Sequence, residues 1–425
     1  MAGSDDTIVA LSSGRLPAAL GIVRASGSGA LALAEALAGS LPEPRQAALR
    51  RFVDPASGEE IDRGLLVIFP GPDSATGEDL IEFHLHGSRA VVDAILRLAI
   101  ARDGVRQAEP GEFTRRALAN GRIDLIQAEG LAELLDAETE LQRRSAQARA
   151  VGDVSRLLAG WRQRLLEISA MAEIAIDYVD EDDGAAAPPF ADGATQLADD
   201  IGTALEAPRV DRLRDGFRIV LAGPPNAGKS SLLNALTGSS RAIVTAVPGT
   251  TRDSIEVPMS HGGLPLVLVD TAGLRDSDNE VERLGISRTG DELEDADLIL
   301  WLGDGDAPTS KPTILISPKS DSGSGVADRI AVSALTGEGL DQLWVQIHDR
   351  IEDRIPAAGQ LSLNLREADT LDGIVIAVRS ASAEPDPLIA SEQLRIARNA
   401  FDRLTGQSGV EDLLDALFGR FCVGK

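Results

Sequence analysis

A glycine-rich loop between an apolar run and a helical pattern is the feature that most constrains this chain. The loop reads Gly223-Pro-Pro-Asn-Ala-Gly-Lys-Ser-Ser231, after the apolar run 219–222 and before the helical pattern 232–236. A strand, a glycine-bounded loop and a helix start, in that order, make a phosphate-binding loop credible. Its backbone N–H groups would surround a β-phosphate, and the helix N-terminus would add a favourable dipole. The alternative for the loop alone is a glycine-rich turn before a helix.

Three side chains of this loop have expected roles in binding. Lys229 would place a charge beside the β and γ phosphates, and Ser230 would be a Mg²⁺ ligand. The amide carbonyl of Asn226, with backbone carbonyls of the 245–250 loop, would coordinate a monovalent cation that replaces the charge of a missing arginine finger. The expected nucleotide contacts are Asn226, Ala227, Gly228, Lys229, Ser230 and Ser231, and the expected K⁺ ligands are Asn226, Thr245, Val247 and Thr250.

Downstream motifs match a nucleotide switch. Gly249-Thr-Thr-Arg-Asp253 is typical of the loop whose threonine, here Thr251, closes over the γ-phosphate and Mg²⁺. The apolar strand 266–269 ends in Asp270-Thr-Ala-Gly273, where Asp270 would hold Mg²⁺ through water and Gly273 would sense the γ-phosphate. The expected contacts are Thr250, Thr251, Asp270, Thr271, Ala272 and Gly273, and the expected Mg²⁺ ligands are Ser230, Thr251 and Asp270.

A third group of motifs points to guanine. Pro318-Lys-Ser-Asp321 follows an apolar run at the place where a GTPase normally carries Asn-Lys-x-Asp. Asp321 can accept hydrogen bonds from N1–H and the 2-amino group of guanine, which adenine does not offer. Ser333-Ala-Leu335 fits the loop whose backbone contacts the guanine carbonyl, so Lys319, Asp321, Ser333 and Ala334 complete the expected GTP contacts. Because Pro318 replaces the asparagine, we expect weaker nucleotide affinity with guanine preference retained.

The residue that orients the attacking water is displaced in this chain. Many GTPases carry a glutamine after Asp-x-x-Gly, but Leu274 occupies that place and cannot hydrogen-bond. Glu282, in the acidic stretch 276–282, is the candidate that replaces it. The alternative is that Glu282 belongs to a solvated face at the start of a helix.

Composition limits the remaining choices. The 425 residues are enough for two or three domains, and the net charge of -26 argues against a broad nucleic-acid-binding surface, though a smaller basic patch is compatible with it. A single cysteine, Cys422, excludes an internal disulfide and suits a reducing cytoplasm. The chain lacks a run of about eighteen apolar residues and a signal-peptide pattern. We expect a soluble, cytoplasmic protein without a membrane segment.

The first part of the chain, residues 1–118, mixes strand and helix patterns and predicts an α+β domain. Strands are expected at 7–11, 21–24, 65–69 and 80–87, and helices at 31–41 and 91–102. In the last of these strands Ile81, Phe83 and Leu85 alternate with Glu82, His84 and His86, which places those three polar residues on one face. A metal site is possible there, but a solvated or pocket-lining face is favoured.

Helical patterns flank the GTPase motifs on both sides. They run from Ile126 to Ala150, then through Leu158 to Ala172, and return at 368–380, 389–404 and 410–421. The expected architecture is therefore a discontinuous helical domain (119–213 and 353–425) into which an α/β P-loop GTPase domain (214–352) is inserted.

The chain resembles the MnmE (TrmE) family of tRNA-modification GTPases from end to end. The matching stretches are Asp6–Ala10 with Gly21–Arg24, Pro110–Ala117 with Asn120–Glu129, the GTPase motifs, and the ending Phe421-Cys-Val-Gly-Lys425. The turn 12–17 departs from the Pro-Pro-Gly-Arg-Gly form common in the family. The resemblance implies an N-terminal domain that binds folate and dimerises, a helical domain, and a potassium-activated GTPase domain that dimerises across its nucleotide face.

The resemblance also implies a reaction. With a flavin-dependent partner of the MnmG type, in a heterotetramer, family members add a carboxymethylaminomethyl or aminomethyl group at C5 of the wobble uridine (U34) of tRNA. The one-carbon unit comes from a reduced folate, 5,10-methylenetetrahydrofolate or 5-formyltetrahydrofolate.

Individual roles carry over by position. Asn226 takes the cation-binding role, Glu282 orients water, and Cys422 is the C-terminal cysteine required for modification but not for GTP hydrolysis. For a lone terminal cysteine, the alternative is an incidental thiol. The expected folate contacts are Arg24, Glu78, Arg122 and Lys425, against the alternative of structural or solvated roles.

A function of a different class uses the same GTPase motifs. A GTP-dependent ribosome-assembly or signalling switch would bind a partner and do no tRNA chemistry. The folate-like N-terminal domain and the Cys422 terminus distinguish the two, because a pure switch needs neither.

Overall fold

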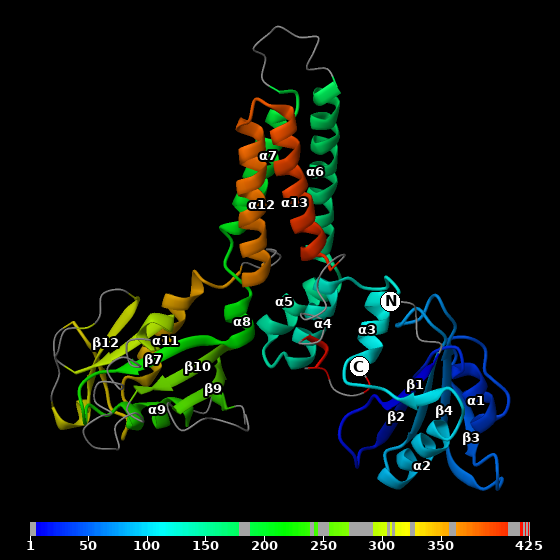
Figure 1. The fold of residues 1–425 in the computed structure, drawn as a ribbon. Coiled ribbons are helices and arrows are strands. Elements are labelled where there is room, and N and C mark those ends of the chain that lie inside the picture. The colour runs from blue at the N-terminus through cyan, green and yellow to red at the C-terminus, as the bar shows by residue number, and fades with distance from the viewer. Residues whose placement is uncertain are drawn as a thin grey trace, which may run out of the picture. The chain divides into compact units, whose positions relative to one another are not determined.

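The computed structural model describes residues 6–177, 188–238, 242–244, 255–271, 292–303, 307, 311–323, 328–356, 363–406, 417–419, 421 and 424. The chain divides into two compact units, Met1–Ala132 with Asp402–Lys425, and Glu133–Phe401 (Figure 1). Each unit contains helices and a β-sheet. The predicted mixture of α/β and helical structure is therefore confirmed.

The first unit is built on a six-stranded sheet with the order β3-β4-β5-β2-β1-β6. Neighbouring strands are antiparallel, except that β1 and β6 are parallel. The strands are β1 Thr7–Leu11, β2 Leu20–Ser26, β3 Ala48–Val53, β4 Glu60–Phe69, β5 Leu80–His86 and β6 Val105–Gln107. Along β5 the predicted alternation is confirmed: Phe83 and Leu85 are buried, whereas Glu82 and His84 are half-buried and His86 is exposed.

Helices cover both faces of this sheet. The helices α1 (Ala30–Ala38) and α2 (Arg89–Ile100) share one hydrophobic core with Val9 and Phe83. The helix α3 (Glu112–Ala119) packs its Phe113 against Ile8 in a second, smaller cluster. Because successive strand residues point to opposite faces, β1 is covered on both sides, and the polar residues of β5 share the face of the sheet on which α3 lies.

The helical pattern expected from Ile126 to Ala150 is divided in the structure. One helix, α4, spans Leu125–Asp136, and the next, α5, spans Glu140–Ala150. Thr139 caps α5: its Oγ1 accepts from the Gln142 N–H at 3.2 Å, and Gln142 Oε1 accepts from the Thr139 N–H at 2.9 Å. This capping box satisfies backbone donors at the start of α5 and separates it from α4. The expectation of one uninterrupted helical pattern was wrong at this point.

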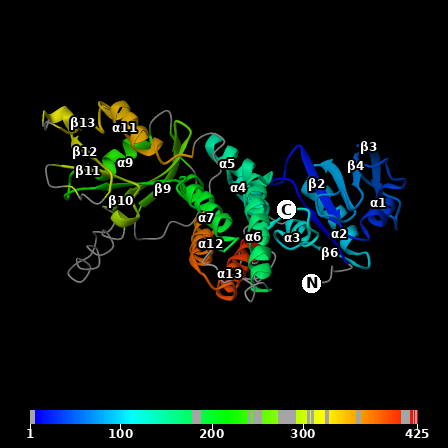
Figure 2. The same cartoon turned by 90° about the horizontal axis from the view of Figure 1, so that it is seen from above.

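A bundle of long helices forms one part of the second unit. Its helices are α6 Asp153–Asp177, α7 Ala191–Leu205, α12 Leu365–Ala383 and α13 Pro387–Leu404, and the short α8 spans Asp211–Asp215. The long helices α6, α7, α12 and α13 lie side by side in Figure 2, with α7 packed along α12 and against α6. In the described part of the chain, no helix combines the length and apolar character that a membrane crossing requires.

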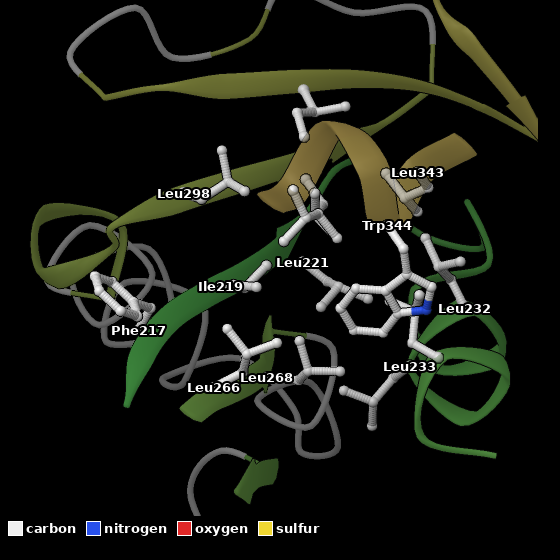
Figure 3. Packing of buried hydrophobic residues seen from close by; sticks show 14 of the residues in the cluster. Phe217, Ile219, Leu221, Leu232, Leu233, Leu266, Leu268, Leu298, Leu343 and Trp344 are labelled. Atoms are coloured by element: carbon white, nitrogen blue, oxygen red, sulfur yellow. The ribbon is translucent and has the colours of Figure 1, made fainter. Parts of the chain in front are cut away.

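A seven-stranded sheet with the order β13-β12-β11-β7-β10-β9-β8 forms the other part. Its elements are β7 Phe217–Ala222, α9 Lys229–Thr237, β8 Ala242–Val244, β9 Ile255–His261, β10 Leu264–Asp270, β11 Leu298–Leu302, β12 Thr313–Pro318, the 3-10 turn Ser320–Ser322, β13 Ile330–Val332 and α11 Leu340–Glu352. The strands from β13 to β10 in this order are parallel, and β9 and β8 are antiparallel to their neighbours. Figure 3 shows Leu221 and Leu268 of the sheet packed against Leu233 of α9 and Trp344 of α11. Parallel strands bring their carboxyl ends to one edge, which is where ligands bind in such sheets.

The chain enters and leaves this sheet-bearing segment at one place. The Val210 N–H donates to Leu363 O at 3.1 Å, and the Leu365 N–H donates to Asp211 Oδ2 at 2.6 Å. Nε2 of Gln142, on α5, donates to Leu213 O at 2.9 Å. These bonds connect α5 and α8 with the start of α12.

A buried ion-pair network joins α5 to α12. Arg149 is 1% exposed, and its two Nη atoms donate to Glu367 at 3.0 and 2.8 Å; Glu367 is 0% exposed. Arg149 Nε lies 3.1 Å from Glu133 Oε2 on α4. Glu367 also completes the capping box of α12, because its Oε2 accepts from the Asn364 N–H at 2.9 Å. Because the charges of Arg149 and Glu367 are both buried, removing either partner would leave an uncompensated charge inside the bundle.

Candidate nucleotide-binding site

The loop between β7 and α9 has a backbone that few residues other than glycine adopt. Gly223 has φ 143°, and a Cβ there would lie 2.2 Å from Leu302 O. Gly228 has φ 98° and is the N-cap of α9, and Asn226 is left-handed with φ 62°. The strand, the loop and the helix occur in the order expected of a phosphate-binding loop.

Lys229, Ser230 and Asp270 meet at the carboxyl edge of the sheet. Lys229 is 8% exposed, and its Nζ donates to the carbonyls of Gly223 and Pro224, both at 3.1 Å. Ser230 Oγ donates to Asp270 Oδ2 at 2.6 Å. Asp270 is 0% exposed at the end of β10, beside β7. A hydroxyl and a carboxylate oxygen in contact are the donors that Mg²⁺ prefers, so these residues fit that ion.

Two contacts shape the loop expected to bind the base. Lys319 Nζ donates to Asn226 O at 3.2 Å, and Ser333 Oγ donates to Asp321 Oδ1 at 2.6 Å. The first contact ties the base loop to the phosphate loop. The second fixes the carboxylate of Asp321. Ala227 lies in the phosphate loop, Ser231 in the first turn of α9, and Ala334 in the loop after β13. Thr271 directly follows β10, and its Oγ1 donates to Leu221 O at 2.9 Å.

Several predicted site residues lie outside the part of the chain that the structure describes. They are Thr245, Val247, Thr250, Thr251, Ala272, Gly273, Glu282, Cys422 and Lys425. Their roles stay predictions.

The N-terminal unit carries a second polar site on the face of its sheet that bears α3. Arg24 donates to Glu82 Oε1 through Nη2 at 2.7 Å and through Nε at 3.0 Å, and His84 Nε2 lies 3.1 Å from Glu82 Oε2. Burial raises the pKa of Glu82, but hydrogen bonds from Arg24 and His84 outweigh it, and the pKa is lowered overall. Arg24 and Glu82 are direct cross-strand partners of β2 and β5. Sequence reasoning placed Glu82 on a polar face but missed this pairing.

The other residues predicted for folate have different partners. Glu78 Oε2 accepts from Ser26 Oγ at 2.8 Å and from Arg116 Nη1 at 3.1 Å. Arg116, which was not singled out from the sequence, also pairs with Asp6 at 2.7 Å. Arg122 lies at the surface, with a long ion pair of 3.7 Å to Asp73.

The less favoured metal site on β5 receives no support. His86 Nδ1 lies 2.7 Å from Asp62 Oδ1, whereas His84 pairs with Glu82. Among the described residues, no group of three or more His, Cys, Asp or Glu side chains is arranged to hold a metal ion.

Comparison with known proteins identifies the family. The family model of the GTP-binding protein TrmE N-terminus matches residues 7–122, and that of the MnmE helical domain matches residues 125–422. The tRNA modification GTPase MnmE of Erythrobacter litoralis is 51% identical over 424 residues, covering 99% of this chain and 100% of the relative. That of Novosphingobium aromaticivorans is 49% identical over 435 residues, covering 99% and 100%. The chain belongs to the MnmE family of tRNA modification GTPases.

As a member of the MnmE family, the chain is a GTP hydrolase and the GTPase component of tRNA modification, and it binds GTP with magnesium. This finding favours the prediction of tRNA chemistry over that of an assembly or signalling switch. Among solved structures, the G domain of the T. maritima FeoB iron transporter is 28% identical, covering 32% of this chain and 98% of its own, with a TM-score of 0.24. That score is too low to support an argument about this chain.

Proposed function

We propose that this chain modifies the wobble uridine (U34) of tRNA together with a flavin-dependent partner of the MnmG type. The product is a carboxymethylaminomethyl or aminomethyl group at C5, and the carbon comes from 5,10-methylenetetrahydrofolate or 5-formyltetrahydrofolate. The chain acts in the cytoplasm as a homodimer that forms a heterotetramer with the partner. The match of residues 7–122 to the TrmE N-terminus, which a GTPase switch would not need, is the observation that carries this proposal.

In the GTPase reaction the chain's own residues bind and orient. Lys229 and the N–H groups of the 226–231 loop neutralise the phosphates, while Ser230, Thr251 and Asp270 hold Mg²⁺, which supplies positive charge to the phosphate oxygens. The side chain of Leu274 has no hydrogen-bonding group, so we assign the orientation of the attacking water to Glu282. Asn226, with the backbone oxygens of Thr245, Val247 and Thr250, holds K⁺ when two GTPase domains face each other.

For the folate we propose the polar site of the N-terminal unit. A reduced folate offers ring N–H groups to a carboxylate and carboxylates to a cation. Arg24 and Glu82 form such a donor and acceptor set, and their side chains are 26% and 15% exposed, so a ligand can reach them. Glu78, Arg122 and Lys425 stay proposed contacts of the same ligand. The proposed domain boundaries are 1–118, 119–213 with 353–425, and 214–352.

We expect GTP hydrolysis to be faster in potassium than in sodium buffer, because K⁺ adds positive charge beside the phosphates. Asn226→Ala should lose this stimulation. Glu282→Ala should lower kcat by roughly 10²-fold or more, the usual effect of losing a group that prepares the nucleophile, with GTP affinity retained. Steady-state hydrolysis and fluorescent-nucleotide binding measure the two effects separately.

Matched controls are available in the same segment. Asn234 and Glu294 are both exposed, and both lie at helical positions. Asn234→Ala and Glu294→Ala should keep the parent rate and its potassium dependence. Cation-independent hydrolysis that neither Asn226→Ala nor Glu282→Ala changes would show that both roles are assigned wrongly.

We expect selectivity for guanine to depend on Asp321 despite the proline at position 318. Asp321→Asn should weaken GTP binding by about 10²-fold or more, because hydrogen bonds to a charged group contribute about 1.5–3 kcal/mol each. Xanthosine triphosphate should bind the variant better than GTP does, since its 2-oxo group accepts from the new amide. Asp341→Asn, at an exposed position of α11, is the control. Calorimetric titration measures the nucleotide affinity of the parent chain and of both variants. Equal affinity of the parent chain for ATP and GTP would contradict the prediction.

A further inference from the structure

The last described residues of the chain pack into the N-terminal unit. Phe418 is 0% and Phe421 is 6% exposed, and their rings are tilted with centroids 6.0 Å apart. The Phe421 N–H donates to Phe418 O at 3.1 Å, which makes a tight turn. Phe421 immediately precedes Cys422 in the sequence, and Phe418 lies four positions before it.

The start of α3 forms the seat for Phe418. Gly111, the N-cap of α3, is left-handed with φ 69°. A Cβ at Gly111 would lie 2.7 Å from Phe418 O and 2.9 Å from Phe418 Cβ, closer than real contacts allow. Arg115, one turn further along α3, holds its guanidinium 5.3 Å from the centroid of the Phe418 ring, in a cation–π contact. Gly111 is therefore needed both for its backbone conformation and for the space it leaves.

A second seat holds Gly424, which follows Cys422 by two positions in the sequence. Gly424 has φ 99°, and a Cβ there would lie 2.2 Å from Leu11 O. Ser12 Oγ donates to Gly424 O at 2.8 Å in a partly buried bond. The turn that begins at Ser12 departs from the usual family form. In this chain the Ser12 side chain binds the backbone of Gly424. The described residues 418, 419, 421 and 424 are called the C-terminal segment here, and Phe418 and Gly424 at its two ends both contact the N-terminal unit.

The same helix also reaches the polar site. Phe113 of α3 lies under Arg24, with the guanidinium carbon 5.8 Å from the ring centroid, and Arg24 in turn binds Glu82. One helix therefore contacts both the pair that we propose for folate and the anchor of the C-terminal segment.

We propose that Gly111, Arg115 and Ser12 are positioning residues for the C-terminal segment in tRNA modification. They act through Phe418 and Gly424, and GTP hydrolysis does not depend on them. The proposal rests on the proposed role of Cys422 in the modification step, and it adds the residues that set where the chain on either side of that thiol is held.

The test uses the amide of the buried residue Phe421, which donates to Phe418 O and reports release of the segment. Gly111→Ala should raise the hydrogen-exchange rate of this amide in the full-length protein about tenfold or more, because release of the segment is a local opening that does not unfold the rest. The same variant, assayed with the partner protein and tRNA, should lose modification and keep the parent rate of GTP hydrolysis.

Gly121→Ala is the matched control. Gly121 is also left-handed, with φ 65°, lies just after α3, and a Cβ there would meet nothing within 4 Å. Gly121→Ala therefore introduces the same kind of backbone strain as Gly111→Ala, but no steric clash. Ser12→Ala removes the hydrogen bond to Gly424 O, and Arg115→Leu removes the cation–π contact with Phe418, both without backbone strain. They therefore still test the proposal where Gly111→Ala folds poorly. Each should raise the exchange rate of the Phe421 amide about threefold, the effect of one lost hydrogen bond or cation–π contact.

Two results would overturn the proposal. One is exchange of the Phe421 amide in Gly111→Ala, Ser12→Ala and Arg115→Leu at the rate of Gly121→Ala. The other is faster exchange with full modification activity, which would show that the seat exists but does not serve the reaction. Full modification by Cys422→Ser would instead refute the proposed role of the thiol, while the exchange rates would still decide whether Gly111 seats the segment.

Discussion

Replacing Lys229 by alanine is expected to lower the rate of GTP hydrolysis roughly 10²- to 10³-fold at saturating GTP. This is the usual effect of removing one preorganised group that stabilises charge in the transition state. The Lys229 side chain is buried and its ammonium is held between two loop carbonyls. Its position is therefore set before the nucleotide binds, and water screens it little. Nucleotide affinity should fall as well, because on this prediction the same charge would contact the bound phosphates.

Single-turnover hydrolysis separates the chemical step from binding. Lys311, which precedes β12 in the same segment and is half-buried, provides the matched control: Lys311→Ala removes the same charge and should keep the parent rate. Lys229→Arg tests placement, since a planar guanidinium does not fit where a compact ammonium is enclosed, and it should also lose most activity. Hydrolysis by Lys229→Ala at the parent rate, with normal thermal unfolding, would show that this loop is not the phosphate site.

Removing Arg149 is expected to have the largest effect on stability. Arg149→Met should destabilise the helical bundle by about 3–5 kcal/mol, the usual cost of leaving a buried charge without its partner. The carboxylate of Glu367 is completely buried, so it cannot replace the lost guanidinium with water. Because a chain of several domains does not unfold in a single step, the measurement is hydrogen exchange of the α12 amides, which reports the opening of that helix.

Two further variants make this test specific. Arg379, on α12 itself, pairs with Asp199 at 3.0 Å, but both side chains are about 60% exposed (59% and 61%). Arg379→Met should therefore cost less than about 1 kcal/mol. Arg149→Met combined with Glu367→Gln should recover most of the loss, because no unpaired charge is left at position 367 while the amide oxygen still accepts from Asn364. An Arg149→Met variant as stable as Arg379→Met would show that the buried pair contributes little.

Local patterns predicted individual strands and helices well. Thr7–Leu11 was expected as a strand and is β1, and the alternation in Leu80–His86 is seen in β5. The strand β3 was not expected, because Ala48–Val53 carries two adjacent arginines and only one fully buried side chain, Phe52. An edge strand exposes most of its residues, so it lacks the apolar alternation on which such predictions depend.

The sequence by itself determined the family and the GTPase chemistry, and it predicted which residues form a phosphate-binding loop. This was possible because a loop of this type uses consecutive residues, whose order is visible in the chain. Tertiary structure alone decided which distant residues meet. Arg24 pairs with Glu82 because of the register of β2 and β5, and Arg149 meets Glu367 across 218 positions of sequence. It also decided that Gly111 seats Phe418. A contact between distant residues depends on how whole elements pack, and no local pattern of residues records that.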